Sequence, residues 1–184
     1  MSVEEASCAD TPFGRYVTSP GWFVLNLGEA LAVRNEEKGG VAYPIEAREH
    51  QFEHFGVHLR VLWPGDPNGL YHSEGMQEGF LVLSGECTLV VEEEERRLRQ
   101  WDYFHCPADT RHILVGAGDR PCSILMIGAR PDEPILYPVS EVAARYGASV
   151  ETETAVPDEA YADWPGDYEP LRLPWPPDDL EGPT

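Results

Sequence analysis

Lysine is nearly absent from this sequence, because Lys38 is the only one among 184 residues. It lies in a polar loop beside Gly39-Gly40, whereas a Schiff-base lysine must be buried before its amine becomes a useful nucleophile. The sequence also contains no phosphate-binding glycine-rich loop ending in lysine, and no dinucleotide-binding fingerprint. Schiff-base catalysis and nucleotide binding are therefore not expected.

Long hydrophobic runs and closely spaced cysteine pairs are also missing. No apolar run approaches the roughly 20 residues that a membrane helix needs, and the sequence shows no signal-peptide pattern. The four cysteines are far apart in the sequence: Cys8, Cys87, Cys106 and Cys122. These absences predict a cytoplasmic protein with reduced thiols and no membrane partner.

Positive charge is scarce too, since 33 Asp and Glu face 13 Lys and Arg, for a formal net charge of −20. Such a chain is repelled by the phosphates of nucleic acids and by anionic lipid surfaces. We therefore expect no nucleic-acid partner. Simple solubility explains the charge more readily than an acidic docking surface.

The length suits one domain with extensions at both ends. Residues 1–20 are predicted to form a flexible segment and residues 21–138 a barrel. Many short alternating strands separated by turn residues point to an all-β sandwich or barrel. Within it, Trp22–Leu27 is predicted as the first strand and Val41–Glu46 as a short strand that Pro44 places at a sheet edge.

Residues 139–184 are predicted to form a short helix followed by an extended acidic, proline-rich tail. Ser140–Tyr146 has helical composition, and Gly147 suits the position just past a helix end. The tail has the composition of a disordered segment. Its large aromatic residues, among them Trp164 and Trp175, nevertheless favour an arm that lies over the barrel or over a partner subunit.

The stretch Tyr71–Glu86, YHSEGMQEGFLVLSGE, carries the strongest chemical signal. His72 and Glu74 are two residues apart and so share one face of a strand, and Glu78 follows four residues later. His112 closes a second polar cluster about thirty residues further on. Two imidazoles with one or two carboxylates are ligands that first-row transition metals prefer.

These residues resemble the two motifs of the cupin superfamily. In the first motif His72, Glu78 and Gly85 are in register, and Glu74 stands where the second His is expected. In the second motif Pro107 and His112 are in register. The departures there are Trp101 for the opening Gly, Asp109 for the Gly after the Pro, and Gly116 for the closing Asn. The chain resembles a small single-domain bacterial cupin, over roughly 55–128.

The resemblance implies a double-stranded β-helix, the jelly-roll barrel of cupins, with a divalent transition metal inside: Fe, Mn, Zn or Ni. The predicted ligands are His72, Glu74, Glu78 and His112. The role of Glu74 stays open, because it either binds the metal or turns away from it. Without Glu74, two His and one carboxylate would leave three open positions, as in non-haem Fe(II) oxygenases.

Other histidines carry weaker signals. His105 is a candidate catalytic or substrate-contacting residue, if strand alternation turns it into the barrel with Tyr103. Cys106 would then face the other way, which counts against a Cys-His nucleophile pair. His50, His54 and His58 recur every four residues, but Gly56 interrupts a helix there, so we expect partly exposed side chains around a strand start.

Function is less determined than fold, because the superfamily hosts many chemistries. The favoured hypothesis is a dioxygenase-like oxidoreductase that acts on a small organic molecule through its metal. A non-catalytic metal- or ligand-binding protein and an isomerase- or epimerase-like protein are the alternatives. The resemblance also implies a homodimer, because small cupins commonly pair through their sheets.

Overall fold

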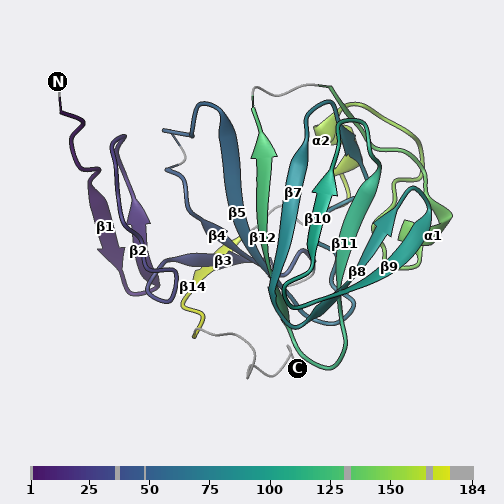
Figure 1. The fold of residues 1–184 in the computed structure, drawn as a ribbon, viewed down its shortest axis with the longest axis horizontal. Helices are drawn as coiled ribbons and strands as arrows, with labels where there is room; N and C mark the ends of the chain where they lie inside the picture. The colour runs from purple at the N-terminus through teal and green to yellow at the C-terminus, as the bar shows by residue number, and fades with distance from the viewer. Residues whose placement is uncertain (1, 36–37, 48, 131–133, 165–167, 175–184) are drawn as a thin grey trace.

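A computed structural model describes the chain except for residues 1, 36–37, 48, 131–133, 165–167 and 175–184. Its centre is a β-barrel of two facing sheets (Figure 1). An N-terminal hairpin of β1 (Cys8–Thr11) and β2 (Gly14–Val17) lies to one side of the barrel. The predicted all-β double-stranded β-helix is thereby confirmed.

The larger sheet has seven strands. In spatial order they are β10 (Tyr103–Cys106), β7 (Glu78–Ser84), β12 (Cys122–Ala129), β5 (Phe55–Leu62), β4 (Val41–Pro44), β3 (Ala32–Arg34) and β14 (Glu169–Leu171). All of its neighbouring pairs are antiparallel. The smaller sheet consists of β11 (His112–Ala117), β8 (Glu86–Val91) and β9 (Glu94–Arg99). A third, two-stranded sheet pairs β6 (Ser73–Glu74) with β13 (Ile135–Leu136).

The strand period of two separates the barrel interior from its outer surface. On β5, Leu62 faces inward and packs with Phe80 and Val82 of β7 and with Ile124 of β12. Leucines and cysteines of the neighbouring strands complete this apolar interior: Cys87, Leu89, Cys106, Leu114 and Cys122. Each of these nine side chains is at most 3 % exposed, so the interior core is dry and closely packed.

A second core lies on the outer face of the larger sheet. Leu59 and Val61 of β5 point outward and pack with Tyr43 of β4, Trp63 and Leu173. Sequence reasoning was wrong in two details here. Residues 22–27 form no strand, although Leu25 and Leu27 pack against this core, and β4 lies between β5 and β3 and is not an edge strand.

The tight turns explain how motif glycines can be replaced. The hairpin between β8 and β9 turns at Glu92 and Glu93, whose φ angles are 48° and 64°. β9 ends at Arg99, and β10 is a separate strand. Trp101 and Asp109, which replace motif glycines, both have positive φ angles, of 75° and 63°. Asp is among the few non-Gly residues that adopt this left-handed backbone readily.

Neighbouring backbone comes so close to Gly85 and Gly116 that neither position can carry a side chain. A Cβ on Gly85, whose φ angle is 68°, would lie 2.4 Å from the Pro121 carbonyl oxygen. A Cβ on Gly116 would lie 2.0 Å from the Trp63 carbonyl oxygen. The motif asparagine is therefore replaced at a point where this chain has no room for any side chain.

The C-terminal part contains the predicted short helix, α1 (Glu141–Ala144), and a second one, α2 (Pro157–Ala160). Ser140 caps α1 by accepting a hydrogen bond from the Ala143 N–H, and Gly147 follows with φ of 64°. From α2 the chain runs on to β14, which pairs with β3. The described part of the tail thus lies on the barrel of its own chain, while Trp175 and the proline-rich end lie outside the described residues.

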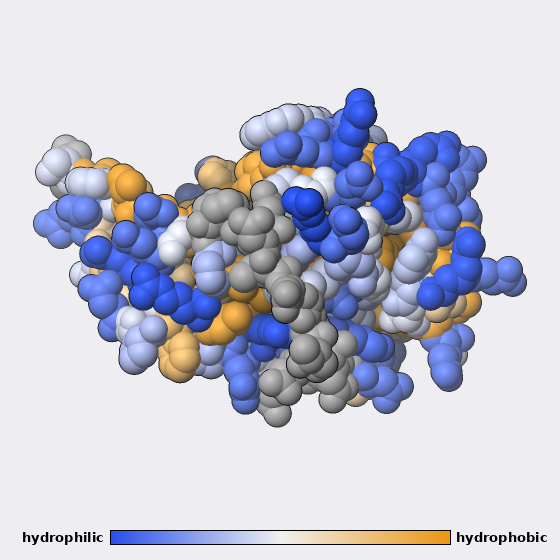
Figure 2. Space-filling view, turned by 90° about the horizontal axis from the view of Figure 1, so that it is seen from below, coloured by the Kyte–Doolittle hydropathy of each residue, from blue (hydrophilic) through white to orange (hydrophobic). Residues whose placement is uncertain are grey.

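Hydrophilic side chains cover much of the face seen from below in Figure 2, in keeping with the large negative charge. Among the described residues, no helix combines the length and apolar character needed to cross a membrane.

Candidate metal centre

His72 and His112 are brought together by the backbone. They form an isolated antiparallel bridge, in which each N–H donates to the other residue's carbonyl oxygen, at 3.2 Å and 2.8 Å. Their ring centroids are 4.9 Å apart. The bridge joins residues from two strands that are distant in sequence, so neither histidine has this partner without the folded barrel.

Both imidazoles are oriented through their Nδ1 atoms. His72 Nδ1 lies 2.6 Å from the Leu70 carbonyl oxygen and His112 Nδ1 lies 3.1 Å from that of Thr110. A carbonyl oxygen can only accept, so each Nδ1 donates its proton there and Nε2 is the ring nitrogen available to a metal ion. Histidines that bind metals in proteins are commonly fixed in this way.

Glu78, the first residue of β7, completes a group of three. Its Oε2 lies 3.2 Å from His112 Nε2 and is buried, yet makes no hydrogen bond to any described residue. One ligand atom from each of His72, Glu78 and His112 lies within 4.8 Å of the other two. A buried carboxylate oxygen without a donor beside two imidazole lone pairs is costly unless a cation binds there. The group therefore fits a divalent metal ion.

Glu74 lies beside this group but is not part of it. Its Oε1 is 3.6 Å from His72 Nε2, and its side chain is 34 % exposed. The contact with His72 lowers the pKa of Glu74, against the opposing effect of burial. Glu74 is therefore an ionised carboxylate at the edge of the site, and its role as a fourth ligand stays a prediction.

The group opens onto a cavity of about 270 Å³ at one end of the barrel interior. Gly56 of β5 and Gly128 of β12 are partners across the two strands and both line the cavity. Because neither has a side chain, the barrel is hollow here instead of packed. A Cβ on Gly128 would lie 3.7 Å from Glu78, so glycine at this position leaves space beside the carboxylate.

Two arginines that line the cavity differ in their partners. Arg130 forms an ion pair with Glu46 at 2.8 Å and donates to the Phe52 carbonyl oxygen. Arg60 donates one hydrogen bond of 3.3 Å to the Gly39 carbonyl oxygen and has no carboxylate within ion-pair distance among the described residues. Neither Arg60 nor Arg111 pairs with Glu78, since Arg111 is bound to Glu92.

Sequence reasoning missed Tyr161, which closes the cavity from the C-terminal segment. The Tyr161 hydroxyl accepts a hydrogen bond of 3.1 Å from the Leu70 N–H. Its ring packs edge-on against Tyr137, which in turn lies 5.8 Å from the His72 ring. A Cβ on Gly69 would lie 2.9 Å from the same hydroxyl. A contact this distant in sequence leaves no local signal.

The predicted orientation of β10 was wrong. His105 and Tyr103 are exposed on the outside, where they border a different hollow, while Phe104 and Cys106 face the interior. The side chains of β10 alternate between the two faces as expected, but the residues expected inside are outside and the reverse. A shift of one residue in a strand moves every side chain to the other face. His105 is thus turned away from the cavity that contains His72, Glu78 and His112.

Cys106, by the same reversal, lies against the site, with its Sγ 3.4 Å from His112 Nδ1. Burial, together with the nearby charge of Glu78, raises the pKa of Cys106 to about 12. The residue is a neutral thiol at physiological pH. A Cys-His nucleophile pair is therefore disfavoured, although for a different reason than the sequence suggested.

His58 is exposed at the cavity, while His50 and His54 are exposed near the start of β5, as the sequence predicted. His58 and Arg60 share the inward phase of Leu62 on this strand. Because His58 and Arg60 alternate in phase with the buried Leu62, the sequence of this strand could have indicated that one end of the barrel interior is polar.

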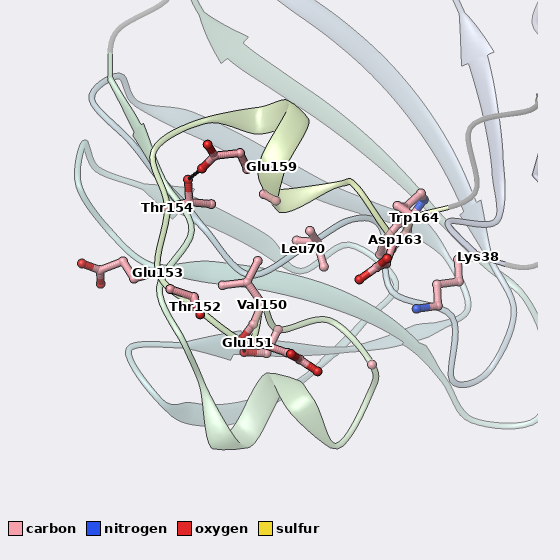
Figure 3. Close-up of a pocket in the computed structure, with 13 residues that line it drawn as sticks. Lys38, Leu70, Val150, Glu151, Thr152, Glu153, Thr154, Glu159, Asp163 and Trp164 are labelled. Carbon is pink, nitrogen blue, oxygen red and sulfur yellow. Dashed lines mark hydrogen bonds between the residues drawn. The ribbon is translucent and has the colours of Figure 1, made fainter.

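A second hollow, of about 390 Å³, is lined mainly by the C-terminal segment, together with Lys38 and Leu70 (Figure 3). Four acidic residues are among those that line it: Glu151, Glu153, Glu159 and Asp163. The Thr154 hydroxyl donates to Glu159 at 2.6 Å, and the Lys38 amine lies 5.2 Å from the centre of the Trp164 ring. Among the described residues, the group that could hold a metal lies in the barrel cavity and not here.

Comparison with known proteins agrees with this architecture. Residues 58–128 match the cupin domain family, whereas no curated protein matches the chain significantly. Among solved structures, the polyketide cyclase RemF from Streptomyces resistomycificus is similar with a TM-score of 0.53 at 14 % identity, over 62 % of this chain and 83 % of that one. That likeness shows the fold alone.

Two further structures are similar over a smaller part. A sugar phosphate isomerase of the cupin superfamily from Silicibacter pomeroyi is 31 % identical, with a TM-score of 0.42, over 44 % of this chain and 53 % of that one. An RmlC-like cupin with a double-stranded β-helix fold from Methanocaldococcus jannaschii is 16 % identical, with a TM-score of 0.40, over 43 % and 72 %. The match to the isomerase spans about half of its length.

The fold and the domain match agree with each other. Residues 58–128 are similar to the cupin domain, and they lie within a double-stranded β-helix of the kind seen in cupin proteins.

Proposed function

We propose that this protein is a metal-dependent enzyme that acts on a small organic molecule, with dioxygenase-like oxidation as the favoured reaction. The observation that carries this proposal is the group of His72, Glu78 and His112 at the base of an open cavity. Two His and one carboxylate leave coordination positions free for a substrate and a co-substrate. A redox-active ion bound there would supply Lewis acidity and electron transfer.

The protein's own residues set up this chemistry. The Leu70 and Thr110 carbonyls hold His72 and His112 with Nε2 directed at the site. Phe80 packs edge-on against the His112 ring, at 5.1 Å between centroids, and limits water on that side. Tyr161 covers the cavity from the C-terminal segment. The resulting site is polar at its base and partly closed, as small-molecule sites commonly are.

An isomerase is the second candidate, and Glu74 is the observation that favours it. Its carboxylate lines the cavity and is kept ionised by His72. A carboxylate in this position can take a proton from a carbon next to a carbonyl and return it elsewhere.

Two measurements on the same substrate candidates distinguish the reactions. Protein loaded with Fe(II) is expected to consume dissolved oxygen in proportion to the substrate converted. Incorporation of solvent deuterium without oxygen uptake would favour the isomerase. Tight ligand binding with neither signal would favour a non-catalytic binding protein.

The homodimer and the cytoplasmic location predicted from the sequence belong to the same proposal. The outer surface of β10 and β12 exposes Tyr103 at 63 % and Ile127 at 43 %, with Trp101 nearby at 68 %. An apolar group of this kind suits pairing of two sheets. Light scattering at micromolar concentration should give twice the mass of one chain, and a monomer mass would contradict the dimer.

A further inference from the structure

Arg60 is a charged cavity residue that the metal site does not explain. It projects from β5 in the inward phase, is partly buried, and lines the same cavity as His72, Glu78 and His112. Its single hydrogen bond of 3.3 Å to the Gly39 carbonyl oxygen uses one of five N–H donors. The guanidinium stays charged at any physiological pH.

The other partly buried arginines among the described residues have clear partners. Arg130 is bound to Glu46 and to the Phe52 carbonyl oxygen. Arg34 lies over the Trp63 ring, 5.2 Å from its centre. A partly buried guanidinium without such a partner loses hydration and recovers little in return. The fold therefore keeps a cation in the cavity at some cost to stability.

The cavity is also built to keep Arg60 near a bound molecule. Burial raises the pKa of Tyr161, while the Leu70 N–H bond and the nearby charge of Arg60 oppose that rise, so Arg60 and Tyr161 lie close to each other. Arg60 and Tyr161 line the cavity together with Glu78 and His112. A ligand that fills about 270 Å³ would touch both ends of this arrangement.

We propose that Arg60 binds the anionic end of the ligand, a carboxylate or a phosphate, while the opposite, oxygen-bearing end of the same molecule lies at the His72–Glu78–His112 group. Only the contact at the His72–Glu78–His112 group rests on the proposed function; the contact at Arg60 does not. Guanidinium binds both anions through two parallel hydrogen bonds, which fixes the orientation of the molecule as well as its affinity. The ligand is thus a small organic anion with oxygen atoms at both ends.

Charge supports this assignment. Glu74 and Glu78 repel an anion in the metal-free cavity, whereas a divalent ion would cancel their two charges and leave Arg60 in excess. Arg130 contributes little to that excess, because Glu46 neutralises it. An anionic ligand would balance the charge of the loaded cavity.

The test compares matched probes on protein loaded with Mn(II), by isothermal titration calorimetry. Succinate and butyrate have the same carbon chain, but butyrate has only one carboxylate. Succinate is expected to bind roughly 10- to 100-fold more tightly, as for charge-assisted hydrogen bonds. Replacing Arg60 (Arg60→Gln) should remove this preference. Oxalate, malonate and glutarate differ from succinate in chain length, so the one that binds most tightly indicates the distance between Arg60 and the metal group.

Arg97→Gln is the matched control, because it removes one arginine charge at the exposed Glu86 pair outside the cavity. It should keep the full preference for succinate. Equal preference in wild type and Arg60→Gln, with folding verified by circular dichroism, would overturn the assignment. If 3-phosphonopropionate binds more tightly than succinate, the anionic group is a phosphate; if it binds more weakly, the group is a carboxylate.

Inorganic phosphate with metal-free protein separates this inference from the proposed function. Arg60→Gln should weaken phosphate binding there even if the protein took up no metal at all. Uptake of Mn(II) without any effect of Arg60 would instead leave the metal site standing and reject the anion site.

Discussion

The two ends of the barrel interior follow opposite rules. At one end Leu62, Val82 and Ile124 are fully buried and pack without polar atoms. At the other end the same three strands place Arg60, Glu78 and Gly128 around a cavity. Within a few residues along each strand, the inward side chains change from closely packed apolar groups to groups that can bind an ion. The apolar end stabilises a scaffold on which the polar end can carry unpaired charge.

This contrast is sharpest on β7. Phe80 and Val82 are 1 % and 0 % exposed, and Glu78 continues the same inward row. A carboxylate in that row has no hydrogen bond at Oε2 among the described residues. The strand therefore includes a locally unfavourable group that a metal ion would make favourable.

The largest effect on stability is expected at the apolar end. Ile124→Ala removes a fully buried side chain from the barrel interior and should lower the free energy of unfolding by about 2–5 kcal/mol. Urea unfolding followed by tryptophan fluorescence measures the loss. Metal affinity of the folded fraction should stay unchanged. A change in metal affinity as large as the change in stability would mean that the two ends are not independent.

The polar end is expected to respond in the opposite way. Glu74→Gln keeps the size of the side chain but removes its charge, so it should have little effect on stability. As a neighbour of the ligands, Glu74 should affect metal affinity by roughly 10- to 100-fold. A larger loss, restored by Glu74→His with a higher reduction potential, would make it a ligand. Titration of metal-free protein with Mn(II) and Fe(II) decides, and unchanged affinity would show that Glu74 does not influence the metal.

The polar end should also be sensitive to acid, through the Glu46 carboxylate that pairs with Arg130. Burial raises the pKa of Glu46, but the Phe52 and Val57 N–H groups and Arg130 lower it further, so the net pKa lies below its ordinary value of 4.5. Its stabilising contribution is therefore complete above that ordinary value and is lost as the pH falls through the folded pKa. Glu46→Gln should cost on the order of 1 kcal/mol at pH 7.

Unfolding measured between pH 7 and pH 3 checks this prediction. The difference in stability between wild type and Glu46→Gln should shrink toward acid pH. A difference that stays constant over this range would mean that the Glu46 charge contributes nothing.

The smallest effect is expected at an exposed side chain, in the turn before β10. Trp101 has a left-handed backbone with φ of 75° and is 68 % exposed. Trp101→Gly should relieve strain of about 1 kcal/mol, partly offset by the flexibility of glycine in the unfolded chain. Differential scanning calorimetry should show a small rise in the melting temperature. A fall would mean that the indole ring packs in a way that outweighs the strain, for example across a dimer.

Sequence patterns predicted the parts of the site that depend on local spacing. His72, Glu78 and His112 could be identified because strand alternation and two motifs fix their phase. Asp109 could replace the motif glycine because Asp adopts the left-handed backbone found there. The phase of β10 was wrong because alternation alone does not say which face is buried, and Phe104 and Cys106 took the interior instead of His105.

Other features depend on contacts between distant parts of the chain. Tyr161 reaches the cavity through the Leu70 N–H, and no pattern near Tyr161 indicates that contact. Residues 22–27 read as a strand, but only Trp22 pairs, in an isolated bridge with Glu5, while Leu25 and Leu27 pack against the outer core. The sheet edge beside β3, where a further strand could have paired, is occupied by β14.

The central claim is that the polar end of the barrel binds one divalent metal ion through His72, Glu78 and His112. Elemental analysis of protein purified without added metal tests it most directly, with His112→Ala as the comparison. The account predicts close to one transition-metal ion per wild-type chain and a large loss in the variant, with the barrel still folded by circular dichroism. Full occupancy in His112→Ala, or none in wild type even after incubation with Fe(II), Mn(II), Zn(II) or Ni(II), would contradict it.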